Sequence, residues 1–215
     1  MEDELNTDEI KTFLCIGLTG NFLSGKTTVA KMISSMGYKV ITTDDLAKDI
    51  MNNHTEIKQK IIDNFGNDAY HDSGELNRQH LASLVFADSE AGKTSIELLE
   101  SIVHPHVIDE MILLVDKYEN AGEKIVFVES ALIFEAELDE GFDYIINVTA
   151  PMEIVLKRAE KRGFTREQAL HRLSRQISPE EKSRYSDFTI ENKGSEEDLR
   201  NSTEFIVNLL KSMIE

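Results

Sequence analysis

The residues best suited to chemistry lie near the start of the chain, in a short segment bounded by two glycines. The segment Gly20–Thr27 matches the eight-residue phosphate-binding loop (P-loop), with both glycines, the lysine and the hydroxyl residue in place. Backbone N–H groups in such a loop surround phosphate oxygens. We predict that Lys26 neutralises the β- and γ-phosphates of ATP and that the Thr27 hydroxyl binds Mg²⁺. The predicted ATP-binding residues here are Gly20, Asn21, Phe22, Leu23, Ser24, Gly25, Lys26, Thr27 and Thr28.

The flanking sequence favours this interpretation over a chance match in a flexible glycine turn. Phe13–Leu18 is an apolar run without alternation, which is typical of a strand buried on both faces. Residues 27–36 have the pattern of a helix with Val29, Ala30 and Ile33 facing inward. The match therefore lies directly between a buried strand and a helix, where phosphate binding requires it.

Strands and helices alternate along the rest of the chain. We predict further strands at 39–42, 124–130, 144–148 and 188–191, and a mainly helical stretch over 44–120 that is interrupted near 66–74 and at Pro105. Pro151 is expected to open one helix, and three later helices carry capping-box spacings at Thr165/Gln168, Ser178/Glu181 and Ser195/Asp198. This order predicts an α/β fold, a parallel sheet of about five strands covered by helices.

The amino-acid composition limits the classes of molecule that this chain is expected to bind. The 215 residues include 23 Lys and Arg against 40 Asp and Glu, a formal net charge of −17. That balance argues against nucleic acid or an anionic membrane as the main partner, and no apolar run approaches the ~18 residues of a membrane span. The single Cys15 excludes an internal disulfide and indicates a reducing cytoplasm, and no histidine has the spacing of a zinc site. The oligomeric state stays open.

A P-loop is shared by kinases, switch GTPases and other ATPases, so it does not by itself specify the reaction. Guanine recognition usually needs Asn-Lys-x-Asp late in the chain. Here Asn192–Ser195 reads Asn-Lys-Gly-Ser, without the aspartate that would accept the guanine N–H groups. We therefore favour an ATP-dependent kinase. Another nucleotide or nucleoside kinase and a nucleotide-binding switch protein are the alternatives.

A series of short segments extends this reading along the chain. In order, they are Ile16–Gly20, Val40–Asp44, Gly74–Arg78, Val85–Asp88, His104-Pro105, Leu132–Glu135, Arg158 with Arg162, and Ser186-Asp187 with Asn192–Gly194. Together they resemble the dephospho-CoA kinases, which complete coenzyme A synthesis. The resemblance implies a P-loop core (12–44, 121–150 and 186–215), a helical acceptor-binding region (45–120) and a small helical lid (151–185), after an acidic tail (1–11). It also implies transfer of the γ-phosphoryl group of ATP to the ribose 3′-hydroxyl of dephospho-CoA, with Mg²⁺.

Asp44 follows the second predicted strand, at the edge where parallel α/β sheets bind ligands. A carboxylate there can accept the proton of the acceptor hydroxyl or orient that hydroxyl, and by resemblance Asp44 is the general base. The alternative is a helix N-cap. Both roles could belong to Asp44 or be divided with Asp45.

Five arginines make 158–175 a basic segment in an acidic chain: Arg158, Arg162, Arg166, Arg172 and Arg175. Arg158 and Arg162 are spaced i,i+4 and share a helix face. The alternative is ordinary surface ion pairing with Glu160 and Glu167. We predict that this lid brings Arg158 or Arg162 to the transferring phosphate, with Lys26 and Asp44 as the other catalytic residues.

Other positions have roles by resemblance, each with a structural alternative. Arg78 is expected to bind acceptor phosphates, or else to be solvated, and His104 to touch the acceptor, or else to begin a helix. Asn192 and Gly194 are expected to line the adenine, or else to form a plain turn. Glu129 ends a strand where it, or Asp44, would hold Mg²⁺ through water, or else it is a structural acid.

The chain departs from the family pattern at a few positions. Asn21 and Leu23 stand where glycines are common, and leucine tolerates a left-handed backbone poorly, so we expect altered loop geometry at Leu23. Thr42 replaces the first acid of an Asp-x-Asp pair, and Ala131 stands where proline is typical.

Overall fold

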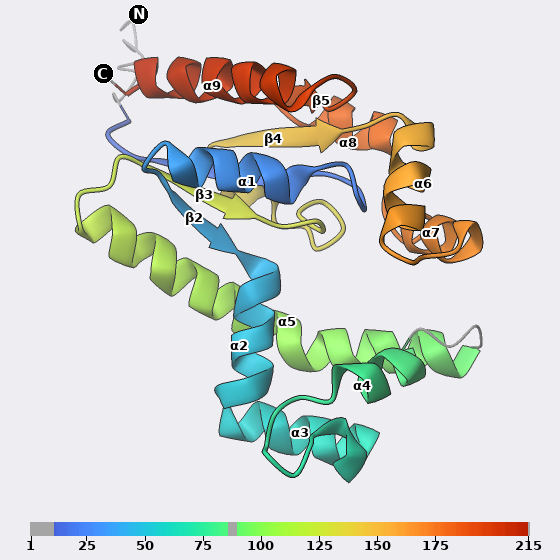
Figure 1. Cartoon of the computed structure of the whole chain (residues 1–215). Helices are drawn as coiled ribbons and strands as arrows, with labels where there is room; N and C mark the ends of the chain where they lie inside the picture. The colour runs from blue at the N-terminus through green and yellow to red at the C-terminus, as the bar shows by residue number, and fades with distance from the viewer. Residues whose placement is uncertain (1–10, 86–89, 215) are drawn as a thin grey trace, which may run out of the picture. The chain divides into compact units, whose positions relative to one another are not determined.

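The computed structural model describes residues 11–85 and 90–214, which divide into two compact units (Figure 1). One unit is Thr42–Leu114, and the other combines the described residues before Thr42 with those from Val115 onward. We describe each unit by itself. The predicted acidic tail, apart from Lys11, and residues 86–88 of the segment Val85–Asp88 lie outside the described residues.

Five strands of the described chain form one sheet: β1 (Leu14–Thr19), β2 (Lys39–Thr42), β3 (Ile125–Glu129), β4 (Tyr144–Thr149) and β5 (Phe188–Glu191). Their order is β2-β3-β1-β4-β5, and β1 pairs in parallel with β3 and β4 while β4 pairs in parallel with β5. Every residue of β1 and β3 is buried, as expected of apolar strands without alternation. The predicted α/β sheet is confirmed.

Helices cover the sheet because each one turns an apolar stripe toward it. In α1 (Lys26–Ser35) the predicted inward residues Val29, Ala30 and Ile33 are buried, and α9 (Glu196–Ser212) packs beside α1 (Figure 1). The loop after β3 lies against β1 at Gly17. A Cβ at Gly17 would stand 2.9 Å from the Ile133 side chain and 3.2 Å from the Phe142 ring, so this glycine admits both.

The remaining helices of this unit are α6 (Met152–Lys161), α7 (Arg166–Leu173) and α8 (Pro179–Tyr185). All three predicted capping boxes are confirmed: Thr165 with Gln168, Ser178 with Glu181, and Ser195 with Asp198 exchange both hydrogen bonds. Pro151 is the N-cap of α6, one residue before the position predicted for it.

The second unit is helical: α2 (Thr43–Asn53), α3 (Thr55–Phe65), a 3₁₀ turn (Asn67–Ala69), α4 (Arg78–Val85) and most of α5 (Glu90–Asn120). Its own apolar core includes Ile57, Ile61 and Phe65 of α3. The predicted interruption at 66–74 is confirmed. No helix in the described residues is long and apolar enough to cross a membrane.

The predicted break at Pro105 is wrong, because α5 continues through it. A proline inside a helix removes one hydrogen bond and costs about 3 kcal/mol. Val103 and Val107 on either side are buried in the core of this unit, and we attribute the continuous helix to that packing. His104 consequently lies inside α5 and does not begin a helix, whereas its contact with the acceptor stays a prediction.

Candidate active site

The P-loop connects β1 to α1 and has left-handed backbone at three positions. Gly20 has a φ of 155°, Leu23 of 59° and Gly25 of 110°. Leu23 therefore has the left-handed conformation although it is not a glycine, which costs about 1–2 kcal/mol for a residue with a Cβ. Asn21 does not have positive φ, so its tolerance of left-handed backbone is not what places it there. Its side-chain Nδ2 instead donates to the Ile177 carbonyl at 2.9 Å.

Both loop glycines are required by close approaches. A Cβ at Gly20 would lie 2.3 Å from the Val148 carbonyl oxygen, and a Cβ at Gly25 would lie 2.1 Å from Nδ2 of Asn192. The Val148 oxygen belongs to the backbone of β4, so a side chain at residue 20 would displace that strand, whereas a side chain at residue 25 would displace the Asn192 amide and strain the backbone at its positive φ. The two glycines thus let the loop lie directly against β4 and against the segment after β5.

Lys26 and Thr27 converge on Glu129, the last residue of β3. The Lys26 ammonium lies 2.7 Å from Oε1 of Glu129, and the Thr27 hydroxyl donates to the same oxygen at 2.9 Å. Glu129 is only 2% exposed, and its other oxygen, Oε2, is buried with no hydrogen-bond partner in the described residues. A buried carboxylate oxygen without a donor is costly unless a ligand supplies one.

The chemistry of this group fits Mg²⁺. The described residues contain no cluster of three or more His, Cys, Asp or Glu side chains, so a fully protein-built metal cage is not present there. Magnesium usually takes only one or two protein oxygens and completes its shell with waters and phosphates. The Thr27 hydroxyl and the unpaired Oε2 of Glu129 are oxygens of the right kind at the phosphate end of the loop.

Arg158 of α6 binds the outside of the loop. Its Nη1 donates to the carbonyl oxygens of Leu23 and Ser24, both at 2.9 Å. Burial, and secondarily the charge of Arg162, lower the pKa of Arg158, which agrees with the predicted shared helix face. Arg162 is the exposed C-cap of α6. Of the two predicted arginines, Arg158 is the one that contacts the P-loop.

Asn192 also binds the loop backbone. Its buried side chain donates to the Ser24 carbonyl at 2.7 Å, and its own N–H donates to the Thr149 carbonyl. A Cβ at Gly194 would stand 2.5 Å from Oδ2 of Asp198, the third residue of α9 and the partner of the N-cap Ser195 in its capping box. These contacts support the loop and the helix, so Asn192 has a structural role in addition to any contact with a ligand. Adenine binding at either residue stays a prediction.

Phe22 at the loop tip lies in a small aromatic and cationic group. Its ring meets Phe164 edge-on, with centroids 5.4 Å apart, and the Arg172 guanidinium lies 5.5 Å from one ring centroid and 5.0 Å from the other. Burial, with the nearby charge of Arg175, lowers the pKa of Arg172. Sequence reasoning identified these arginines and Phe22 but not Phe164, because nothing in the spacing pairs residue 22 with residue 164.

In the second unit, Asp44 is the second residue of α2, and the N-cap is Thr42, whose side chain makes no capping bond. The alternative that Asp44 caps this helix is therefore wrong, because the helix begins one residue earlier. Asp45 pairs with Lys48 at 2.5 Å, whereas the Asp44 side chain has no hydrogen bond or ion pair with the described residues. Asp44 is thus the less engaged of the two carboxylates.

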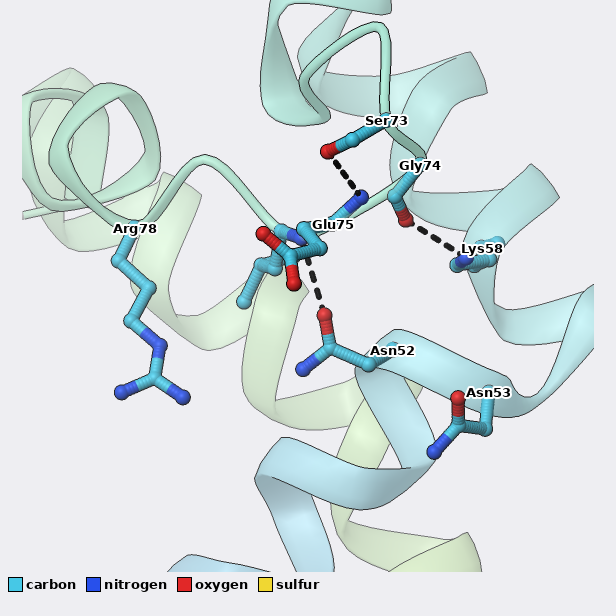
Figure 2. Close-up of a pocket in the computed structure, with 8 residues that line it drawn as sticks. Asn52, Asn53, Lys58, Ser73, Gly74, Glu75 and Arg78 are labelled. Carbon is cyan, nitrogen blue, oxygen red and sulfur yellow. Dashed lines mark hydrogen bonds between the residues drawn. The ribbon is translucent and has the colours of Figure 1, made fainter.

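Arg78 begins α4 beside a polar hollow of about 500 Å³ (Figure 2). The hollow is lined by Asn52, Asn53, Lys58, Ser73, Gly74, Glu75, Leu76 and Arg78. Lys58 donates to the Gly74 carbonyl at 2.7 Å, which occupies part of its ammonium, and no hydrogen bond drawn in Figure 2 involves the Arg78 guanidinium. His104 does not line this hollow.

The contact between Asn192 and the loop generates a prediction. Asn192→Asp replaces the N–H donor with a carboxylate that repels the Ser24 carbonyl, so the loop should lose its shape. We expect ATP binding to weaken by about 1–3 kcal/mol, roughly a factor of 5 to 150 in Kd by calorimetry with Mg²⁺. Lys193→Ala, at the adjacent exposed residue that pairs with Glu191, is the control. An unchanged Kd in Asn192→Asp would contradict this role.

Comparisons with known proteins agree with this geometry. The dephospho-CoA kinase family model matches residues 14–198. A dephospho-CoA kinase of Listeria innocua is 37% identical over 84% of this chain and 88% of its own length. The solved structure of Thermus thermophilus TT1252 matches with a TM-score of 0.72 and 34% identity, over 93% of this chain and 99% of that one. A Campylobacter jejuni dephospho-CoA kinase matches with a TM-score of 0.68 and 26% identity, over 91% and 96% of the two chains. The chain therefore belongs to the dephospho-CoA kinase family.

Proposed function

We propose that this protein transfers the γ-phosphoryl group of ATP to the ribose 3′-hydroxyl of dephospho-CoA, giving coenzyme A. The observation that carries the proposal is the convergence of Lys26 and Thr27 on a buried acid, Glu129, in a chain of this family. Named relatives that span most of the chain support the acceptor.

The P-loop residues would act by positioning and charge. Phosphate oxygens compete with Glu129 for the Lys26 ammonium, so we expect Lys26 to exchange one anion for the other when ATP binds. Thr27 and Glu129 would hold Mg²⁺, which supplies neutralisation of the phosphate charge. Arg158 would keep the Leu23 and Ser24 carbonyls turned away from the phosphates.

The acceptor side of the proposal rests on Asp44 and Arg78. Asp44 has no partner in the described residues that would compete with an acceptor hydroxyl, which suits a general base. Arg78 borders a polar hollow of a size that admits part of a small-molecule acceptor. We assign Arg78 to the acceptor phosphates, because a planar guanidinium fork matches their oxygens. Residues 151–185 would be the lid.

The same proposal includes a cytoplasmic location and small-molecule partners. Burial raises the pKa of Cys15 to about 12, so this thiol is neutral and unreactive. The net charge of −17 opposes binding to nucleic acid, and we propose none.

The direct test is incubation with ATP, Mg²⁺ and dephospho-CoA, with coenzyme A detected by mass. We expect product from the unchanged chain and none after Mg²⁺ is removed by EDTA, because the phosphate charge is then not neutralised. Lys26→Ala should also give no product, whereas Lys31→Ala, at an exposed lysine on the same helix, should be normal. Lack of coenzyme A from the unchanged chain would overturn the acceptor assignment.

The two neighbouring carboxylates can be separated by kinetics. Asp44→Asn is expected to lower kcat by roughly 10²–10⁴-fold, the range for a lost general base, while the KM for ATP stays unchanged. Asp45→Asn should lower kcat far less, since Asp45 pairs with Lys48. Normal turnover in Asp44→Asn would disprove the assignment.

Arg78 is expected to act on acceptor binding alone. Arg78→Ala should raise the KM for dephospho-CoA by roughly ten-fold to a hundred-fold, the loss of a charged hydrogen bond, without affecting the KM for ATP. Arg78→Lys should recover only part of the affinity, because an ammonium cannot bind two phosphate oxygens in a fork. A rise in both KM values would argue for a structural role instead.

A further inference from the structure

The side chain of Lys182 in α8 is fully buried although it carries an ammonium. Its Nζ lies 2.5 Å from the Ala131 carbonyl oxygen, and 3.0 Å and 3.1 Å from the two carboxylate oxygens of Glu135. Burial lowers the pKa of Lys182 against the opposing effect of Glu135, and the charge of Lys26 lowers it further. Such a buried pair is costly to break, since either partner alone would be an uncompensated charge.

The pair holds two residues of the connection between α7 and α8, Gln176 and Ile177, which we call the strap. On one side, Oε1 of Glu135 accepts the Ile177 N–H at 3.0 Å. This is one of the two oxygens that Lys182 binds. Lys182 therefore keeps the Glu135 carboxylate in place to accept from the strap.

On its other side the strap binds the tip of the P-loop. The Ile177 carbonyl accepts from Nδ2 of Asn21 at 2.9 Å, and Oε1 of Gln176 accepts the Phe22 N–H at 2.8 Å. Two consecutive loop residues are thus joined to two consecutive strap residues. The strap thus connects the loop tip to the ion pair of Glu135 and Lys182.

We propose that Glu135 and Lys182 are positioning residues for the nucleotide. They hold the strap, and the strap fixes the P-loop tip in the shape that receives phosphate. The kinetic side of this inference rests on the proposed function, but its binding side needs only the P-loop. The competing explanation is a buried ion pair that stabilises the fold and has no specific effect on ATP.

The test compares three variants by ATP titration calorimetry with Mg²⁺ and by steady-state kinetics. Glu135→Gln removes the charge, Lys182→Met replaces the ammonium with an apolar group of similar length, and Gln176→Ala removes the acceptor for Phe22. Loss of an outer partner behind a metal ligand typically costs about 10–100-fold, and we take that range as the scale for this loop. We expect Kd and KM for ATP to rise by that order, with the KM for dephospho-CoA unchanged.

A matched control is the exposed pair of Lys39 and Glu123 in the same unit, 3.6 Å apart. Lys39→Met and Glu123→Gln make the same chemical changes and should leave both KM values unchanged. A second control measures coupling. In an Asn21→Ala, Gln176→Ala background, which removes both strap contacts, Glu135→Gln should no longer weaken ATP binding, because its route to the loop is gone.

Three outcomes would overturn the proposal. The first is that the variants lower the Tm but leave the Kd for ATP unchanged. The second is that they raise the KM for ATP and the KM for dephospho-CoA equally. The third is that Glu135→Gln still weakens ATP binding fully in the Asn21→Ala, Gln176→Ala background. If Lys182→Met does not fold, Gln176→Ala decides, since Gln176 is only half-buried. If the unchanged chain binds ATP but makes no coenzyme A, the proposed function fails while the Kd values still decide this inference.

Discussion

A loop whose N–H groups face a phosphate must turn carbonyl oxygens the other way, and these oxygens need donors. This constraint organises the P-loop unit. The Ser24 carbonyl accepts from both Arg158 and Asn192, and the Leu23 carbonyl accepts from Arg158. The helix after β4 and the segment after β5 are thereby fixed to the loop. The left-handed backbone of Leu23 is held in the same way, because Arg158 binds the carbonyl that this conformation exposes.

The acidic composition is compatible with anion binding because the cations around the loop are concentrated and supported. Lys26 and Lys182 each pair with a carboxylate, Glu129 and Glu135, and Arg158 is partly buried against loop carbonyls. Neutralising partners let these positive groups lie near one another without the full cost of mutual repulsion and burial. A phosphate that displaces Glu129 from Lys26 would enter an environment already arranged for negative charge.

Local sequence patterns predicted the strands and the helix starts, because these depend on interactions between residues close together in the chain. The unalternating apolar runs of β1 and β3 specify strands buried on both faces, and three polar pairs three residues apart specify the helix starts. The P-loop was found because its residue types are fixed by the phosphate. The continuous helix through Pro105 could not be predicted, since it depends on the burial of Val103 and Val107.

Long-range contacts in the candidate site were equally beyond the sequence. Lys182 lies in a short helix rich in charge, where one more lysine gives no sign of burial. The bond from Asn21 to Ile177 and the bond from Asn192 to Ser24 join residues 156 and 168 positions apart. Only the fold brings these residues together, so the spacing of residues along the chain does not predict these contacts.

That separation has a consequence for synthesis of the protein on the ribosome. The P-loop is made before its donors Arg158 and Asn192, which follow Ser24 by 134 and 168 residues. Chains emerge from the N-terminus at a finite rate, so the loop waits for these two donors while the residues between them are made. During that interval a nascent chain holds the P-loop sequence without the contacts that shape it. The loop therefore gains the full set of these contacts only after β5 has been made, because Asn192 directly follows that strand.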